Sequence, residues 1–292
     1  MESEVLKMEV RPDVKNPCLI MGFSGWMDGG DVSTGVIEYL TTKLGARAFA
    51  VIDPDPFYLL NVPGPMEIAA LFRPHARIEN GEVKMCHAPA STFFCDEGSN
   101  VILFDGKEPN LCWRRYAECI LSLAKDLGVS MICFVGSVAG LVPHTRDPRI
   151  FGSVSDESLL GILDRNEVMP SNYAGPGSFV TYFTSLCKDR GLRMVSLVAE
   201  VPAYVEGKNL RCMAAVIQKL SQILGLSIDI QDLTTMSHAF IERLNETVAQ
   251  RPDLAQQIRK IEQGYDHEKP HDHDEGLRDW FEKQGFEFGG RS

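Results

Sequence analysis

Residues 18–40 read CLIMGFSGWMDGGDVSTGVIEYL, and this stretch decides the fold. Residues 18–22 are apolar without interruption, which is typical of a strand covered on both faces of a parallel sheet. After a glycine-rich turn, Val32, Val36 and Leu40 recur at a spacing near 3.6, so a helix can pack an apolar stripe on that strand. The stretch therefore predicts a strand, a glycine loop and a helix, the repeating unit of α/β proteins.

Strand and helix patterns alternate over most of the remaining chain. Apolar runs predict strands at 47–52, 100–104, 129–135 and 194–201, and helical spacings predict helices at 109–128, 156–163, 179–187 and 210–224. Asn80-Gly81, between two short extended runs, predicts a hairpin in an antiparallel insertion or edge. The alternation predicts an α/β fold, a three-layer sandwich with a mostly parallel central sheet.

From Gln231 onward the pattern changes to helices only, and Pro252 starts the second of two helices that predict an αα-hairpin. We divide the chain into an α/β core domain at 1–230, a helical extension at 231–266 and a polar tail with a short helix at 267–292. Both faces of the core sheet are expected to be covered already. Apolar residues such as Met236 and Phe240 therefore predict that the extension contributes to a homo-oligomer or a partner surface, unless it folds back on the core.

Composition limits the classes of partner. Twenty-nine Lys and Arg against forty Asp and Glu give a net charge of -11, which argues against nucleic acid and anionic membranes as partners. The N-terminal residues lack the pattern of a signal peptide, and no apolar run has the length of a membrane helix, so we expect a soluble, cytoplasmic protein. The eight cysteines are scattered without a CxxC pair, which predicts reduced, metal-free thiols.

Three loops carry the candidate functional residues. The first follows the strand at 18–22, the second, GLVPHTRDPR at 140–149, follows the strand at 129–135, and the third, NYAGPG at 172–177, leads into a helix. Because ligands collect at the carboxyl ends of strands in α/β sheets, we expect these loops to lie together at that edge. The predicted ligand or partner rim consists of Ser24, Trp26, Asp28, His144, Arg146 and Tyr173.

Tests against known motifs do not identify a reaction at this rim. The nucleophile elbow of hydrolases reads G-x-S-x-G, but Trp26 occupies its last position after Ser24, so the serine more simply satisfies backbone groups in a turn. Phosphate-binding glycine motifs are missing as well, and Asp31 is expected to cap the following helix. The sequence predicts no catalytic residue, metal or cofactor.

Two further groups of titratable residues leave a functional and a structural reading open. His144 and Arg146 suit acid–base work or the binding of a carboxylate, whereas Pro143 and Pro148 stiffen their loop and favour a structural role. The histidine- and aspartate-rich segment 266–274 could bind a metal. Its composition is more typical of a solvated linker, because a proline interrupts the helical spacing of its histidines.

The segments GFSGWMDGGD, GLVPHTRDPR and NYAGPG, in this order and spacing, resemble the proteasome assembly chaperone 2 family, its archaeal and bacterial members most closely. The likeness runs from about Leu19 to the extension near Tyr265. It implies an α/β sandwich similar to phosphorylase and hydrolase folds, and members of the family are often labelled ATP-grasp enzymes by inference.

The family resemblance implies binding of other proteins rather than catalysis. Eukaryotic and some archaeal members escort proteasome α-subunits or dock on the α-ring through a C-terminal hydrophobic-Tyr-any tail. Residues 286–292 of this chain read FEFGGRS and depart from that pattern. We therefore expect a non-enzymatic, assembly-chaperone-like protein. The alternative is a hydrolase- or phosphorylase-like enzyme that acts on a small molecule at the glycine-loop rim.

Overall fold

The computed structural model describes residues 5–70, 72–87 and 89–267. Within these residues, nine strands form one mixed sheet in the order β1-β3-β6-β7-β2-β8-β11-β9-β10, and β4 and β5 form a separate hairpin. The main strands are β1 (Leu6–Met8), β2 (Cys18–Ser24), β3 (Arg47–Ile52), β6 (Thr92–Asp96), β7 (Val101–Lys107), β8 (Met131–Gly140), β9 (Ile150–Val154), β10 (Met169–Pro170) and β11 (Met194–Pro202).

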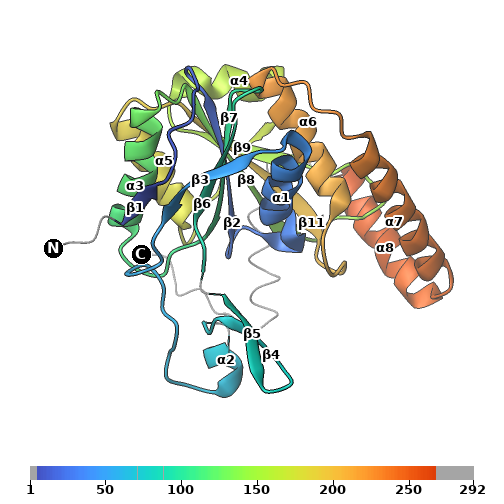
Figure 1. Ribbon diagram of the computed structural model, residues 1–292. Helices are drawn as coiled ribbons and strands as arrows, with labels where there is room; N and C mark the ends of the chain where they lie inside the picture. The colour runs from blue at the N-terminus through green and yellow to red at the C-terminus, as the bar shows by residue number, and fades with distance from the viewer. Residues whose placement is uncertain (1–4, 71, 88, 268–292) are drawn as a thin grey trace, which may run out of the picture.

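Helices cover both faces of the sheet, so the predicted α/β three-layer fold is confirmed (Figure 1). On one face lie α3 and α5, and on the other lie α1, α4 and α6. The helices of these layers are α1 (Val32–Leu44), α3 (Trp113–Asp126), α4 (Leu160–Arg165), α5 (Phe179–Asp189) and α6 (Leu210–Leu224). Short 3-10 helices at Gly29–Asp31 and Glu157–Leu159 precede α1 and α4.

The four central strands β7, β2, β8 and β11 are parallel, and the strands outside them include antiparallel pairs. On one side β6 runs antiparallel to β7 and β3, and on the other side β9 runs antiparallel to β11. The sequence pattern missed β6 and β9, which are short and take their direction from their neighbours. The carboxyl ends of the four central strands nevertheless meet at one edge, which positions the loops described below.

Close approach of α1 to the sheet explains the glycine at the end of the first apolar run. A Cβ atom on Gly22 would lie 2.6 Å from the carbonyl oxygen of Ser33, so a side chain there would collide with the first turn of α1. Ser33 itself is fully buried, accepts a hydrogen bond from the Phe23 amide at 2.9 Å and donates one to the Val135 carbonyl at 2.6 Å. It thereby joins β2 to β8 beyond the last residue pair that these strands share, Met21 and Phe134.

The residues after α6 form two helices that pack beside the core, α7 (Gln231–Ala249) and α8 (Pro252–His267) (Figure 1). Their buried residues are Leu233, Ser237 and Ile258, while Met236 is 57% exposed. The predicted αα-hairpin is present, and it folds back on the core with part of its apolar surface. The predicted polar tail lies outside the described residues apart from His267.

An arm leaves the sheet between β3 and β6. It contains α2 (Met66–Ala70) and the hairpin of β4 (His75–Glu79) and β5 (Glu82–His87), and Figure 1 shows these elements projecting away from the rest of the molecule. The predicted Asn80-Gly81 turn is confirmed, because φ is +51° at Asn80 and +81° at Gly81, as a type I′ turn requires. We use the term arm for residues 59–90.

Candidate functional site

The carboxylate of Glu108 connects two of the three predicted loops. It accepts a hydrogen bond from the Trp26 amide at 3.1 Å and another from the Phe179 amide, the first residue of α5, at 2.7 Å. A negative charge is favourable there, because the free N–H groups at the start of a helix carry partial positive charge. The loop after β2 and the end of the loop that contains Tyr173 therefore meet at Glu108, a residue that the sequence analysis did not single out.

Large apolar side chains are exposed around this point. Trp26 is 59% exposed, Leu59 37%, Leu60 42% and Leu111 41%. Their loops are joined through backbone groups: the Leu111 amide donates to the Phe57 carbonyl at 2.9 Å, and the side chain of Asn110 accepts from the Leu59 amide at 3.1 Å. We call Trp26, Leu59, Leu60 and Leu111 the edge surface. Apolar groups that remain exposed together on a soluble protein are typical of a surface that binds another protein.

Ser24 and Asp28 have structural contacts in the loop after β2. The Ser24 carbonyl accepts from the Glu108 amide at 2.9 Å. Asp28 accepts from the amide and the hydroxyl of Thr34 at 3.1 and 2.8 Å, so it supplies the cap of α1 that we expected from Asp31. That expectation was wrong, because Asp31 has φ of +48° and its side chain makes no capping hydrogen bond. Burial raises the pKa of Asp28, and the bonds to Thr34 oppose that shift.

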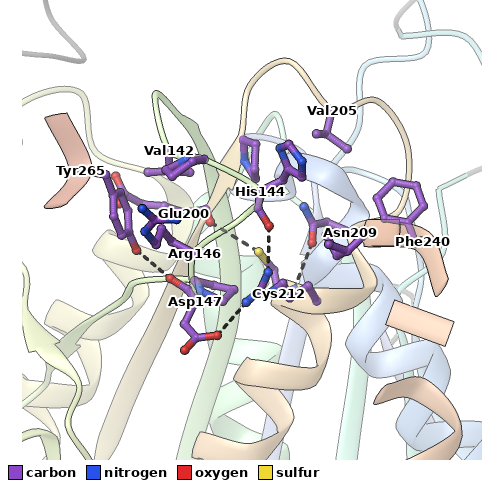
Figure 2. A pocket seen from close by; sticks show the side chains of 15 residues that line it. Val142, His144, Arg146, Asp147, Glu200, Val205, Asn209, Cys212, Phe240 and Tyr265 are labelled. Atoms are coloured by element: carbon purple, nitrogen blue, oxygen red, sulfur yellow. Dashed lines mark hydrogen bonds and ion pairs between the residues drawn. The ribbon is translucent and has the colours of Figure 1, made fainter. Parts of the chain in front are cut away.

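His144 is only 3% exposed and lies between the core and α7 (Figure 2). Its Nδ1 atom is 2.7 Å from the Tyr204 hydroxyl, and its Nε2 atom is 3.1 Å from the side-chain oxygen of Asn245 in α7. The Tyr204 hydroxyl also accepts from the His144 amide at 2.8 Å, which leaves its proton for Nδ1. A neutral imidazole with its proton on Nε2 satisfies every one of these bonds, in agreement with burial, which lowers the pKa of His144.

Arg146 contacts α8 rather than an open site. Its guanidinium donates to both carboxylate oxygens of Asp266, at 2.9 and 2.7 Å, and to Glu262 at 3.2 Å. The neighbouring Thr145 donates to Glu262 as well, and the ring of Tyr265 lies 3.6 Å from the guanidinium of Arg149. The loop at 140–149 thus holds the α7–α8 hairpin against the core.

The space beside His144 is small. It measures about 20 Å³ and is lined by Phe240 and Tyr265 of the hairpin, together with core residues such as Val142 and Cys212 (Figure 2). A cavity of this size has room for about one water molecule. Arg211 completes its wall, because it donates to the His144 carbonyl and to the Asp147 carboxylate, at 2.8 Å each.

The six predicted rim residues therefore separate into two groups. Ser24, Trp26 and Asp28 belong to the loop that Glu108 holds, and Tyr173, 56% exposed, lies in the loop that leads to the same carboxylate. His144 and Arg146 follow β8 at the same edge of the sheet, but their side chains bind the α7–α8 hairpin. A role of these residues in function stays a prediction.

A second carboxylate was missed by the sequence analysis. Asp105, near the end of β7, lies beside Gly22 of β2 in the sheet register. Burial, together with the nearby charges of Asp28 and Glu38, raises the pKa of Asp105 to about 6. Its only sequence signal is an acid directly after an apolar run.

In the described part of the chain, no group of three or more His, Cys, Asp or Glu side chains is arranged to hold a metal ion, and no helix is long and apolar enough to cross a membrane.

Comparison with known proteins gives a family. The model of the PAC2 family matches residues 22–248. The chain belongs to the PAC2 family. No curated protein matches the chain, and none of the names found in these comparisons supports the ATP-grasp label.

Solved structures similar to this PAC2 chain share its fold. A proteasome-assembly chaperone homologue of Mycobacterium tuberculosis, Rv2125, has 24% identity and a TM-score of 0.72, with 82% of this chain and 99% of that chain covered. PbaB of Pyrococcus furiosus, an archaeal proteasome activator, has 19% identity and a TM-score of 0.61 over 83% of this chain and 97% of its own. Rv2714 of M. tuberculosis, a protein of unknown function, has 19% identity and a TM-score of 0.79 over 91% and 92%.

Proposed function

We propose that this PAC2 protein is a non-enzymatic, assembly-chaperone-like protein that binds other protein subunits through its edge surface, acts in the cytoplasm and forms a homo-oligomer. The observation that carries the proposal is the exposure of Trp26 and of three leucines on loops that hydrogen bonds connect at the carboxyl edge of the sheet. Tryptophan in such a position is a frequent centre of binding energy in protein interfaces. The names of similar proteins, an assembly-chaperone homologue and a proteasome activator, point to the same class of partner.

Charge supports a protein partner as well. The net charge of -11 disfavours nucleic acid and anionic lipid, while the edge surface itself is apolar.

The geometry at His144 does not favour the alternative function, a hydrolase or phosphorylase. Both ring nitrogens are hydrogen-bonded to protein groups, and the adjacent space of about 20 Å³ does not admit a substrate.

A photo-crosslinking amino acid at position 26 tests the proposed surface in the native cell. We expect it to capture a defined protein subunit, and the same group at position 125, an exposed lysine of α3, serves as the control. The captured subunit, once purified, should bind wild-type protein and bind Trp26→Ala at least about tenfold more weakly, because a central aromatic contact contributes more than about 1.4 kcal/mol. Equal crosslinking at both positions, or equal binding by Trp26→Ala, would refute the proposed surface.

A further inference from the structure

The arm differs in charge from the rest of the chain. Residues 59–90 contain three acidic and three basic side chains, whereas the whole chain has a net charge of -11. Two copies of this protein repel each other over most of their surfaces, and this repulsion is weakest where the charges within each copy cancel. The arm also projects from the body (Figure 1), so two arms can meet while the two bodies stay apart.

In the described part of the chain, neither edge of the β4–β5 hairpin is paired with a further strand, and two apolar side chains on one face are exposed. Within the described residues its strands pair only with each other. Ile78 and Val83 lie opposite each other in the register, on one face, and are 64% and 62% exposed. An isolated two-stranded hairpin is marginally stable in water, and a third and fourth strand with a shared apolar face stabilise it.

The turn determines which backbone groups point outward. Glu79 and Glu82 flank the two-residue type I′ turn and form its hydrogen-bonded pair. Because hydrogen-bonded and non-hydrogen-bonded pairs alternate along antiparallel strands, the next pair, Ile78 and Val83, directs its N–H and C=O groups to the open edges. Ile78 is therefore placed to exchange backbone hydrogen bonds with another strand at the β4 edge.

The charges on β4 are arranged to fit a second copy of the same strand. Arg77 and Glu79 flank Ile78, and the opposite edge has the reverse order, with Glu82 before Val83 and Lys84 after it. If two β4 strands pair antiparallel about a two-fold axis at Ile78, each Arg77 lies opposite the Glu79 of the other copy. Cross-strand pairs of opposite charge stabilise a sheet. Within one hairpin Glu79 faces Glu82, and each glutamate contacts the basic side chain of its own strand, Arg77 at 3.3 Å for Glu79 and Lys84 for Glu82. The two-fold pairing adds a cross-strand partner of opposite charge to Arg77 and Glu79.

We infer that the β4 edge of the arm pairs with the β4 edge of a second copy, in an antiparallel two-fold interface centred on Ile78. The β5 edge is less suitable, because the register shift between Arg77 and Ile78 leaves Lys84 as an extra residue on β5. The joined hairpins form a four-stranded sheet with Ile78 and Val83 of both copies in one apolar row. This inference rests on the self-association part of the proposed function. Leu59 and Leu60 of the edge surface belong to the arm, but neither lies on β4, so the variants tested below leave the edge surface unchanged.

Paired charge variants test the interface. Arg77→Glu and Glu79→Arg each place like charges opposite each other in the two-fold pairing, so each variant alone should self-associate on the order of tenfold more weakly. An equimolar mixture of the two should recover the wild-type dissociation constant, because the opposite charges face each other again. Arg77 is 62% exposed and Glu79 50%, so neither substitution is expected to disturb folding, and circular dichroism checks this. Lys260→Glu, on an exposed part of α8, is the control with the same change of charge as Arg77→Glu.

Sedimentation velocity over a concentration series distinguishes the outcomes. Weakening in both variants with recovery in the mixture supports the interface. Wild-type self-association that neither variant changes overturns the β4 pairing and leaves the proposed self-association intact, whereas a wild-type monomer at the highest soluble concentration overturns both.

A disulfide provides a second measurement at the two-fold axis. Facing Cα atoms in a hydrogen-bonded antiparallel pair lie about 5.5 Å apart, within the range of a disulfide. In a background with Cys86→Ser and Cys112→Ser, which removes the two exposed thiols, Ile78→Cys should form a covalent dimer on mild oxidation. Val83→Cys is the matched position on the other edge, and faster crosslinking there than at position 78 would overturn the choice of β4.

Discussion

Replacement of His144 by alanine should loosen the α7–α8 hairpin without unfolding the sheet. The substitution removes the bonds to Tyr204 and Asn245 at 2.7 and 3.1 Å, each contributing about 1 kcal/mol, and leaves the space of a buried imidazole empty. The expected cost is about 2–3 kcal/mol, which falls on the docking of the hairpin because Asn245 belongs to α7. Leu233 and Ile258 remain buried in the variant, so the hairpin opens more often but stays docked on average.

Native-state hydrogen exchange measures this effect residue by residue. Amides of α7 and α8 should exchange about 30- to 150-fold faster in His144→Ala, while amides of β8 and β11 keep their protection. His238→Ala, an exposed histidine on α7, is the matched control and should change neither group. A uniform loss of protection over the sheet and the hairpin, or no change in the hairpin, would refute the idea that His144 holds these helices in place.

Acid should reproduce part of the His144→Ala effect in the wild-type protein. Burial lowers the pKa of His144, so as the pH falls below about 6.5 the undocked state takes up a proton before the docked state does. The contribution of His144 is therefore complete above about pH 6.5 and is lost as the pH falls toward its folded-state pKa. Hairpin exchange in His144→Ala should lack this component, which separates the imidazole from the nearby Glu262 and Asp266 carboxylates.

Three further substitutions have expected outcomes of known sign. Asp105→Asn should raise the free energy of unfolding by about 1–2 kcal/mol at pH values above about 6, because the folded chain ionises this carboxyl only near pH 6. The gain should shrink as the pH falls and vanish near about pH 3, where Asp105 is largely protonated in both the folded and the unfolded state, and urea titrations at the two pH values check the sign. Gly22→Ala should lower the free energy of unfolding by about 2 kcal/mol or more, because the added Cβ atom would lie 2.6 Å from the carbonyl oxygen of Ser33. Gly264→Ala is the comparison within α8, where the added Cβ atom meets open space, and it should raise the free energy of unfolding by about 0.5–1 kcal/mol. Thermal melts measure both changes. Glu108→Ala should cost about 1–2 kcal/mol through the loss of two backbone contacts, and Glu108→Gln, which keeps one carbonyl acceptor, should fall between it and the wild type in the same assay.

The main elements of the fold could be predicted from local patterns in the sequence. Uninterrupted apolar runs located β2 and β3, helical spacings located α6 and α7, and Asn80-Gly81 located the hairpin of the arm. These signals work because burial on two faces, burial on one face and a positive φ each require particular residue types. The antiparallel direction of β9 has no such local signal, because it follows from pairing with β11, which comes about forty residues later in the chain.

The candidate site was predictable only in part. The rigid loop at 140–149 was recognised, but the groups of the hairpin that contact His144 and Arg146 belong to Asn245, Glu262 and Asp266, more than a hundred residues away in the sequence. A single sequence does not show such contacts, so the acid–base reading and the structural reading of that loop looked alike. Glu108 was missed for a related reason. Its carboxylate accepts two hydrogen bonds from backbone amides, and every residue type except proline has such an amide, so the sequence does not identify the partners.

The two ends of the arm lie side by side, and this makes the arm a replaceable part. The Ile52 amide donates to the Ser91 carbonyl at 2.8 Å, and the Tyr58 hydroxyl lies 3.1 Å from the Ser91 hydroxyl, so the chain leaves and re-enters the sheet at nearly one point. Lengthening a loop whose ends are already fixed changes its closure entropy only slowly. The arm can therefore be grafted, shortened or exchanged between relatives while the register of β3 and β6 is kept, and the contacts it makes can diversify independently of the sheet that carries it.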